Sequence, residues 1–199
     1  MPSQSWQEWY STRASKLDEI EAAHRSIGGT ARGRRYATEQ INHAYAVLLA
    51  SQFQGFCRDL HSECVDFIIQ GLVPVVATAP AGFLQSVLQG VLVLGRQLDK
   101  GNANPGNIGA DFNRFGLQFW EQVYREDSGN VRRRELLEEL NSWRNAIVHQ
   151  DFDPSKLGGT TTLHLAHIRQ WRRACDGLTL SFDNVMHQHI ATATGSAPW

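Results

Sequence analysis

Two side chains at the end of one predicted helix have chemistry that cleavage of RNA without a metal ion requires. Arg144 supplies a permanent cation that can grip a phosphate through two parallel hydrogen bonds. His149 supplies a group that can take up and release a proton near neutral pH. These residue types predict a candidate catalytic site for phosphate chemistry.

The separation of five residues does not by itself bring the two side chains together. An α-helix turns by ~100° per residue, so Arg144 and His149 lie about 140° apart around its axis. A shared site needs a distorted last turn, an arginine that reaches round the helix, or two copies that pool their residues. The alternative interpretation is that His149 caps the helix C-terminus and that Arg144 is solvated or ion-paired.

The stretch 131–153 predicts the helix that carries these residues, because apolar side chains recur in it at spacings of four, three and four. They form one buried face: Leu136, Leu140, Trp143 and Ile147.

Three arginines in the first turn of this helix form a second candidate group. Arg132, Arg133 and Arg134 oppose the helix dipole, so a contact must offset their charge. Pairing of Arg134 with Glu138 would do so. An RNA backbone or the acidic surface of a partner would do so as well. We therefore treat the three arginines as candidate substrate-binding residues.

Composition indicates one domain whose net charge is too small to produce a strong electrostatic field. A chain of 199 residues can form one sizeable core, and nothing signals a second domain, so we expect a single domain over 1–199. The net charge is −1, so nucleic acid would have to bind at local patches. Three widely placed cysteines and the absence of a signal peptide favour reduced thiols in a cytoplasmic protein.

No charged residue lies between Asp66 and Arg96, which raises the question of a membrane span. Prolines, glycines and glutamines interrupt the segment, and no apolar run approaches the ~20 residues that a span needs. We expect no membrane segment, but a loop and a central helix that Thr78 caps. Apolar residues on more than one side of that helix predict several neighbours, a second subunit among them: Phe83, Leu84, Val87, Leu88, Val91 and Leu94.

Cys57, His61 and Cys64 are spaced so that they can face one metal ion, but only three ligands are visible. Burial in the core is the alternative, because cysteine is among the most often buried residues. Without four ligands or a carboxylate cluster, we expect no metal and no cofactor.

Helical periodicity covers most of the remaining chain. A first helix runs to about Arg25 after Ser3 or Ser5 as its cap, and the longest pattern covers 36–70. The segment 101–107 is a loop by composition. An aromatic stripe from Phe112 to Val123 predicts one helix, and a last helix starts at about Thr161 and is loosened at Gly177. With no alternating strand pattern, we expect an all-α, up-and-down bundle of five or six helices.

The segment RNAIVH, residues 144–149, resembles the Arg-x4-His signature of HEPN domains (higher eukaryotes and prokaryotes nucleotide-binding), including the Asn that often follows the Arg. The stretch 43–68 is similar to the long second helix of the HEPN branch linked to RiboL-PSP proteins. Here Gln54 stands where that helix has an acidic residue, so an ion pair that supports Arg144 is missing. The resemblance covers about residues 36–192.

The resemblance implies a four-helix core, a homodimer with paired signatures in a cleft, and metal-independent endoribonuclease activity. His149 would exchange a proton with the ribose 2′-hydroxyl or the leaving 5′-oxygen, and Arg144 would stabilise the phosphorane-like transition state. Asn145 would orient phosphate or His149. Such an enzyme would act in the cytoplasm as a toxin or defence effector that an antitoxin-like protein restrains.

Two alternatives remain open on the sequence. Other HEPN domains bind nucleotide or RNA, or a protein partner, without cutting, and the missing acid and the near-neutral charge favour such a module. A purely structural bundle, in which the signature serves packing and capping, is the third possibility.

Overall fold

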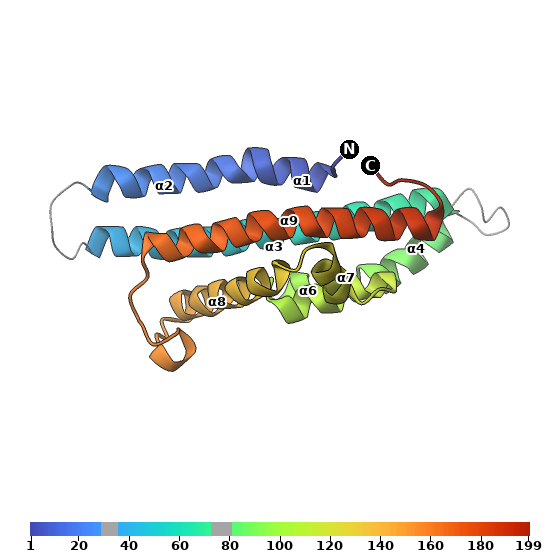
Figure 1. Ribbon diagram of the computed structural model, residues 1–199. Coiled ribbons are helices and arrows are strands. Elements are labelled where there is room, and N and C mark those ends of the chain that lie inside the picture. The colour runs from blue at the N-terminus through green and yellow to red at the C-terminus, as the bar shows by residue number, and fades with distance from the viewer. Residues whose placement is uncertain (29–35, 73–80) are drawn as a thin grey trace.

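The computed structural model describes residues 1–28, 36–72 and 81–199 (Figure 1). Within these ranges the chain forms helices and no strand, so the predicted all-α class is confirmed. The elements are α1 (Gln4–Glu8), the π-helical turn η1 (Trp9–Arg13), α2 (Ala14–Gly28), α3 (Tyr36–Leu72), α4 (Ala81–Leu92), α5 (Gln97–Lys100), α6 (Pro105–Phe112), the 3-10 turn η2 (Asn113–Phe115), α7 (Phe119–Glu126), α8 (Asn130–His149), the 3-10 turn η3 (Pro154–Lys156) and α9 (Leu165–Thr194).

Four long elements make an up-and-down bundle. The continuous rod from α1 to α2 packs on α3, α3 packs on α8 and α9, and α8 packs on α9. Figure 1 shows that successive long elements run in alternating directions, and that α6 and α7 continue the layer of α8. The N-terminal rod belongs to the core, since Trp9 and Leu17 are each 1% exposed. The bundle therefore begins well before residue 36, where the family resemblance starts.

Aromatic rings join the elements at the centre of the bundle. Phe182 of α9 is fully buried, and its ring centroid lies 4.8 Å from that of Phe119 in α7 and 6.0 Å from that of Phe53 in α3. Phe112 of α6 stacks on Phe119 at 4.5 Å. Burial of such large side chains contributes most of the stabilising free energy of a helical bundle.

The prediction of one helix from Phe112 to Val123 was wrong. Helix α6 ends at Phe112, η2 follows, and Gly116 has a φ of 82°, a left-handed conformation that glycine adopts without strain. The chain therefore turns before α7 begins at Phe119. Phe112 and Phe119 are buried and Phe115 and Trp120 are partly buried against the core, but two helices and a turn present them.

Two further boundaries differ from the expectation. The loop predicted over 101–107 is shorter, because Asn104 accepts a hydrogen bond from the backbone N–H of Asn107 and caps α6, which begins at Pro105. Helix α9 is not loosened at Gly177. There, a side-chain Cβ would lie 2.3 Å from Nε of Arg133, so the glycine makes room for this arginine within a continuous helix.

The N-cap of α1 is one of the two serines that the sequence suggested. The Ser3 side chain accepts a hydrogen bond from the backbone N–H of Trp6, so Ser3 and not Ser5 caps α1. The predicted cap Thr78 lies outside the described residues.

Helix α4 rests on α3 through a small separate core of Val65, Ile69 and Leu92. Its other side carries exposed apolar residues: Phe83, Val87 and Val91, followed by Leu94 just after the helix. Contacts on one side are thus observed, and the expected second subunit stays a prediction. No helix in the described part of the chain combines the length and the apolar character needed to cross a membrane.

Candidate active site on helix α8

The buried stripe of α8 sets the direction of the candidate catalytic side chains. Leu136, Leu140 and Trp143 are each at most 6% exposed and pack in the core. This rotation leaves Arg144 half-buried at the edge of the stripe, and leaves Asn145 and His149 exposed. The helix thus places all three side chains within reach of solvent.

Arg144 is held by a neutral side chain and not by an acid. Its Nη1 donates a hydrogen bond to Oδ1 of Asn145 at 3.1 Å. Nδ2 of Asn102, which follows α5, donates to the same oxygen at 3.2 Å. Among the residues that the structure describes, no carboxylate lies within 4 Å of the Arg144 guanidinium. The positive charge of Arg144 therefore has no counter-ion among the described residues.

His149 and Asn145 line one hollow of about 390 Å³, and Arg144 is not among its lining residues. The hollow lies between α8 and η3, and its other walls are Ser142, Ala146, Asp151, Lys156 and Leu157. Helix α8 stays helical to His149, and only Gln150 turns into the left-handed region, with a φ of 55°. The last turn is therefore not distorted, so a shared site needs the reach of Arg144 or a second copy.

A larger hollow of about 610 Å³ continues along α8 and shares Ser142, Lys156 and Leu157 with the first. Glu135, Glu138 and Glu139 line it. Arg132 and Lys156 line the same hollow, and Arg132 pairs with Glu135 and Glu139, so this side of α8 carries charges of both signs.

The three candidate substrate-binding arginines have contacts of their own. Arg132 donates to Glu135 at 2.7 Å and to Glu139 at 3.5 Å. Arg133 pairs with Asp127 and also donates to Oδ1 of Asn130 at 2.7 Å. These contacts offset the opposition between the arginine charges and the helix dipole.

Arg134 stands over a ring instead of pairing with Glu138. Its Cζ lies 5.5 Å from the ring centroid of Trp120, a cation–π contact. Arg134 precedes Arg144 by ten residues, which is about 15 Å along a helix. The arginine triplet and the Arg144 site thus occupy different parts of α8.

Gln54 makes contacts that an acid could not make. Its Nε2 donates hydrogen bonds to the backbone oxygens of Leu98 at 2.7 Å and of Gly101 at 2.8 Å. Both contacts need a donor, which an ionised carboxylate lacks. Gln54 therefore ties the start of the 101–104 segment to α3 and does not contact Arg144.

Cys57, His61 and Cys64 lie fully buried in the bundle. Burial raises the pKa of both thiols well above the usual value. Burial and the nearby Arg96 lower the pKa of His61 to about 3, and Arg96 Nη1 lies 3.4 Å from its Nδ1. Within the described ranges, no three His, Cys, Asp or Glu side chains are grouped so as to hold a metal ion. The core alternative accounts for these three residues.

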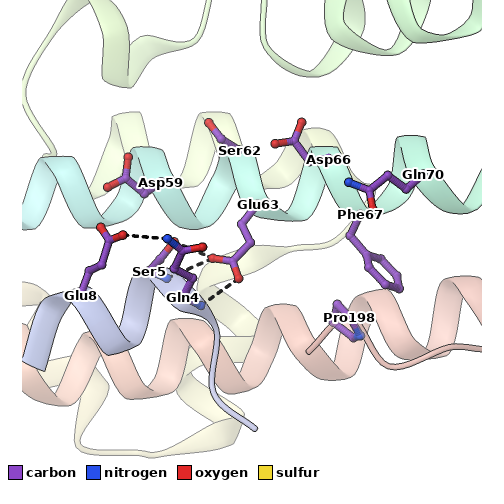
Figure 2. Close-up of a pocket in the computed structure, with 10 residues that line it drawn as sticks. All are labelled: Gln4, Ser5, Glu8, Asp59, Ser62, Glu63, Asp66, Phe67, Gln70 and Pro198. Atoms are coloured by element: carbon purple, nitrogen blue, oxygen red, sulfur yellow. Dashed lines mark hydrogen bonds between the residues drawn. The ribbon is translucent and has the colours of Figure 1, made fainter.

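A separate acidic hollow of about 480 Å³ lies where α1 meets α3 (Figure 2). Figure 2 shows Glu63 pointing toward the start of α1, where it accepts hydrogen bonds from the backbone N–H groups of Gln4 and Ser5. This carboxylate stabilises the positive end of the N-terminal helix. No pattern in the sequence indicates this contact between α1 and α3, and its role is structural.

Comparisons of the chain with protein-family models, curated proteins and solved structures gave no match.

Proposed function

We propose that the protein is a metal-independent endoribonuclease of HEPN type, with Arg144 and His149 as its catalytic residues. The observation that carries the proposal is that the guanidinium of Arg144 has no counter-ion among the described residues. Its hydrogen-bond acceptor, Asn145, also lines the hollow that contains His149. An arginine in that state attracts a phosphate, and an imidazole that reaches the same phosphate can move the proton that cleavage requires.

The reaction follows from the chemistry of the two side chains. The ribose 2′-oxygen attacks phosphorus and loses its proton to a base, while the bond from phosphorus to the 5′-oxygen breaks and that oxygen takes up a proton. His149 serves one of these proton transfers. Arg144 stabilises the charge on the phosphorane-like transition state, and Asn145 orients the phosphate. The products carry a 2′,3′-cyclic phosphate and a 5′-hydroxyl.

Incubation of the purified protein with end-labelled single-stranded RNA tests this activity. We expect fragments that end in a 2′,3′-cyclic phosphate, at the same rate in the presence of EDTA, because no step uses a metal ion. Gel electrophoresis and mass spectrometry of the fragments give the rate and the end groups. RNA that remains intact, or cleavage that EDTA abolishes, would contradict the proposal.

A homodimer would allow the two residues to act together. Arg144 does not line the hollow of His149. The simplest complete site would therefore combine Arg144 of one copy with His149 of another. A two-fold axis that pairs the ends of α8 would create two such sites. We expect light scattering at tens of micromolar to give twice the chain mass. A monomer that still cleaves RNA would exclude a shared cleft.

The second candidate is a module that binds nucleotide, RNA or a protein partner without cutting. The separation of Arg144 from the His149 hollow favours it. In either case the three arginines of the first turn of α8 would contribute to binding by exchanging their present partners for phosphates. As an enzyme, the protein would act in the cytoplasm as a toxin or defence effector, with an antitoxin-like partner that covers the site.

A further inference from the structure

The segment between α5 and α6 is tied to both of its neighbours by side-chain amides. Gln54 of α3 binds the backbone oxygens of Leu98 and Gly101. On the other side, Nδ2 of Asn141 in α8 donates to the backbone oxygen of Ala103 at 3.0 Å. The segment is thereby fixed between α3 and α8, although Asn102 itself is only half-buried.

This segment carries Asn102 to the side chain that holds Arg144. Nδ2 of Asn102 donates to Oδ1 of Asn145, and its own Oδ1 accepts from Nδ2 of Asn104 at 2.9 Å. Asn145 Oδ1 receives Arg144 Nη1 as its second donor. The orientation of Arg144 therefore depends on a chain of amides that starts at Gln54.

The charge of this chain of amides is zero. A carboxylate in place of Asn102 or Asn145 would orient an arginine as well, but it would also neutralise the guanidinium and compete with a phosphate for it. Neutral amides orient the side chain and leave its charge available. Gln54, in place of an acid, therefore supports Arg144 indirectly through neutral amides, and the support of Arg144 is not lost.

We propose that Asn102 is a positioning residue for Arg144, fixed by Gln54 and acting through Asn145, so that an uncompensated guanidinium faces an anionic phosphate. This inference rests on the proposed function, because it assigns a role at the same site. It also predicts a property of Arg144 that can be measured without any RNA.

Binding of an RNA that cannot be cut tests the role of charge. The probe is a fluorescent single-stranded RNA with 2′-O-methyl groups at every ribose, and its affinity is measured by anisotropy. We expect Asn102→Ala to weaken binding by about tenfold, the effect of a lost hydrogen bond in support of a charged group. Asn102→Asp should weaken it by roughly a further threefold, because the new carboxylate pairs with Arg144, and added salt should reduce that further loss.

A role in packing alone would give the opposite order. Aspartate has nearly the shape of asparagine and can still accept from Asn104, so Asn102→Asp would then bind better than Asn102→Ala. That order would overturn the proposal. Asn184→Ala is the matched control, because Asn184 also makes one exposed side-chain hydrogen bond, to Glu126, and should bind as the unchanged protein does. Thermal melts show that each variant is folded.

The NMR signal of the Arg144 Nε–Hε group separates this inference from the proposed function. The signal is assigned by its loss in Arg144→Lys. We expect Asn102→Ala and Gln54→Glu to shift or broaden it, since both release the amide chain, whereas Asn184→Ala leaves it in place. If the protein neither binds nor cuts RNA but the signal moves, the proposed function fails and the positioning role stands. An unmoved signal overturns the positioning role whatever the RNA assays show.

Discussion

Arg144→Ala and His149→Ala are each expected to lower the rate of RNA cleavage by about 10²- to 10⁴-fold. The double variant should lose little more than either single one. Residues that act in one transition state are strongly non-additive, because either loss alone removes the catalysed path. If each residue contributed a separate binding contact, the two losses would multiply instead.

Cleavage of labelled single-stranded RNA by the folded variants measures these effects. Arg125→Ala and His164→Ala are the matched controls, since Arg125 is exposed on α7, His164 is exposed at the residue before α9, and both changes should leave the rate unchanged. Unchanged cleavage by folded Arg144→Ala and His149→Ala would remove both residues from the mechanism. Loss that accompanies unfolding would return them to the role of holding the end of a core helix.

The non-catalytic module gives a different result in the same assays. The RNA then stays intact with the unchanged protein. Arg144→Ala weakens RNA affinity more than His149→Ala, because a guanidinium carries a permanent charge and can bind a phosphate through two parallel hydrogen bonds.

The long helices could be predicted because each has an apolar stripe that repeats over many turns. For α8, this stripe gave a helix that the structure ends at His149. The aromatic stripe near Phe112 was misleading, since the same spacing is produced by two helices with a turn between them. A single glycine, Gly116, decides between these cases through its left-handed backbone, and its sequence position alone does not reveal that conformation.

The site could be predicted only as far as residue chemistry goes. Arg144 and His149 stand out by type, but the support of Arg144 comes from Asn102, which is 43 residues away from Asn145. Such a contact has no periodic signal in the chain. The many asparagines of segment 101–107 are visible in the sequence, but composition alone identifies the segment only as a loop and does not connect it with Arg144. The role of Gln54 likewise depends on two backbone oxygens, those of Leu98 and Gly101, which only the folded chain brings close to it.

Glu21 holds three helices together through one buried carboxylate. Its Oε1 accepts hydrogen bonds from Arg25 at 2.7 Å and from Nε and Nη2 of Arg169 in α9 at 3.0 and 2.7 Å. Its Oε2 accepts from the hydroxyl of Tyr45 in α3 at 3.2 Å. The Glu21 side chain is 10% exposed. Removal of a buried partner from such a group leaves cations without compensation.

These contacts predict how stability depends on pH. Burial alone would raise the pKa of Glu21, but the hydrogen bonds from Arg25 and Arg169 outweigh it and lower the pKa to about 2. The folded value lies below the ordinary value of 4.5, so the ionised carboxylate stabilises the fold at every pH above about 4.5. This contribution is lost as the pH falls from about 4.5 toward 2.

Glu21→Gln is therefore expected to lower the free energy of unfolding by about 2 to 3 kcal/mol at pH 7, and by much less near pH 2. Urea unfolding at a series of pH values measures both proteins, and their difference isolates Glu21 from the other carboxylates. Glu19→Gln, an exposed change on the same helix, is the control and should differ little from the unchanged protein. If the difference between Glu21→Gln and the unchanged protein stays constant from pH 7 to pH 2, the ionised carboxylate of Glu21 does not link α2 to α3 and α9.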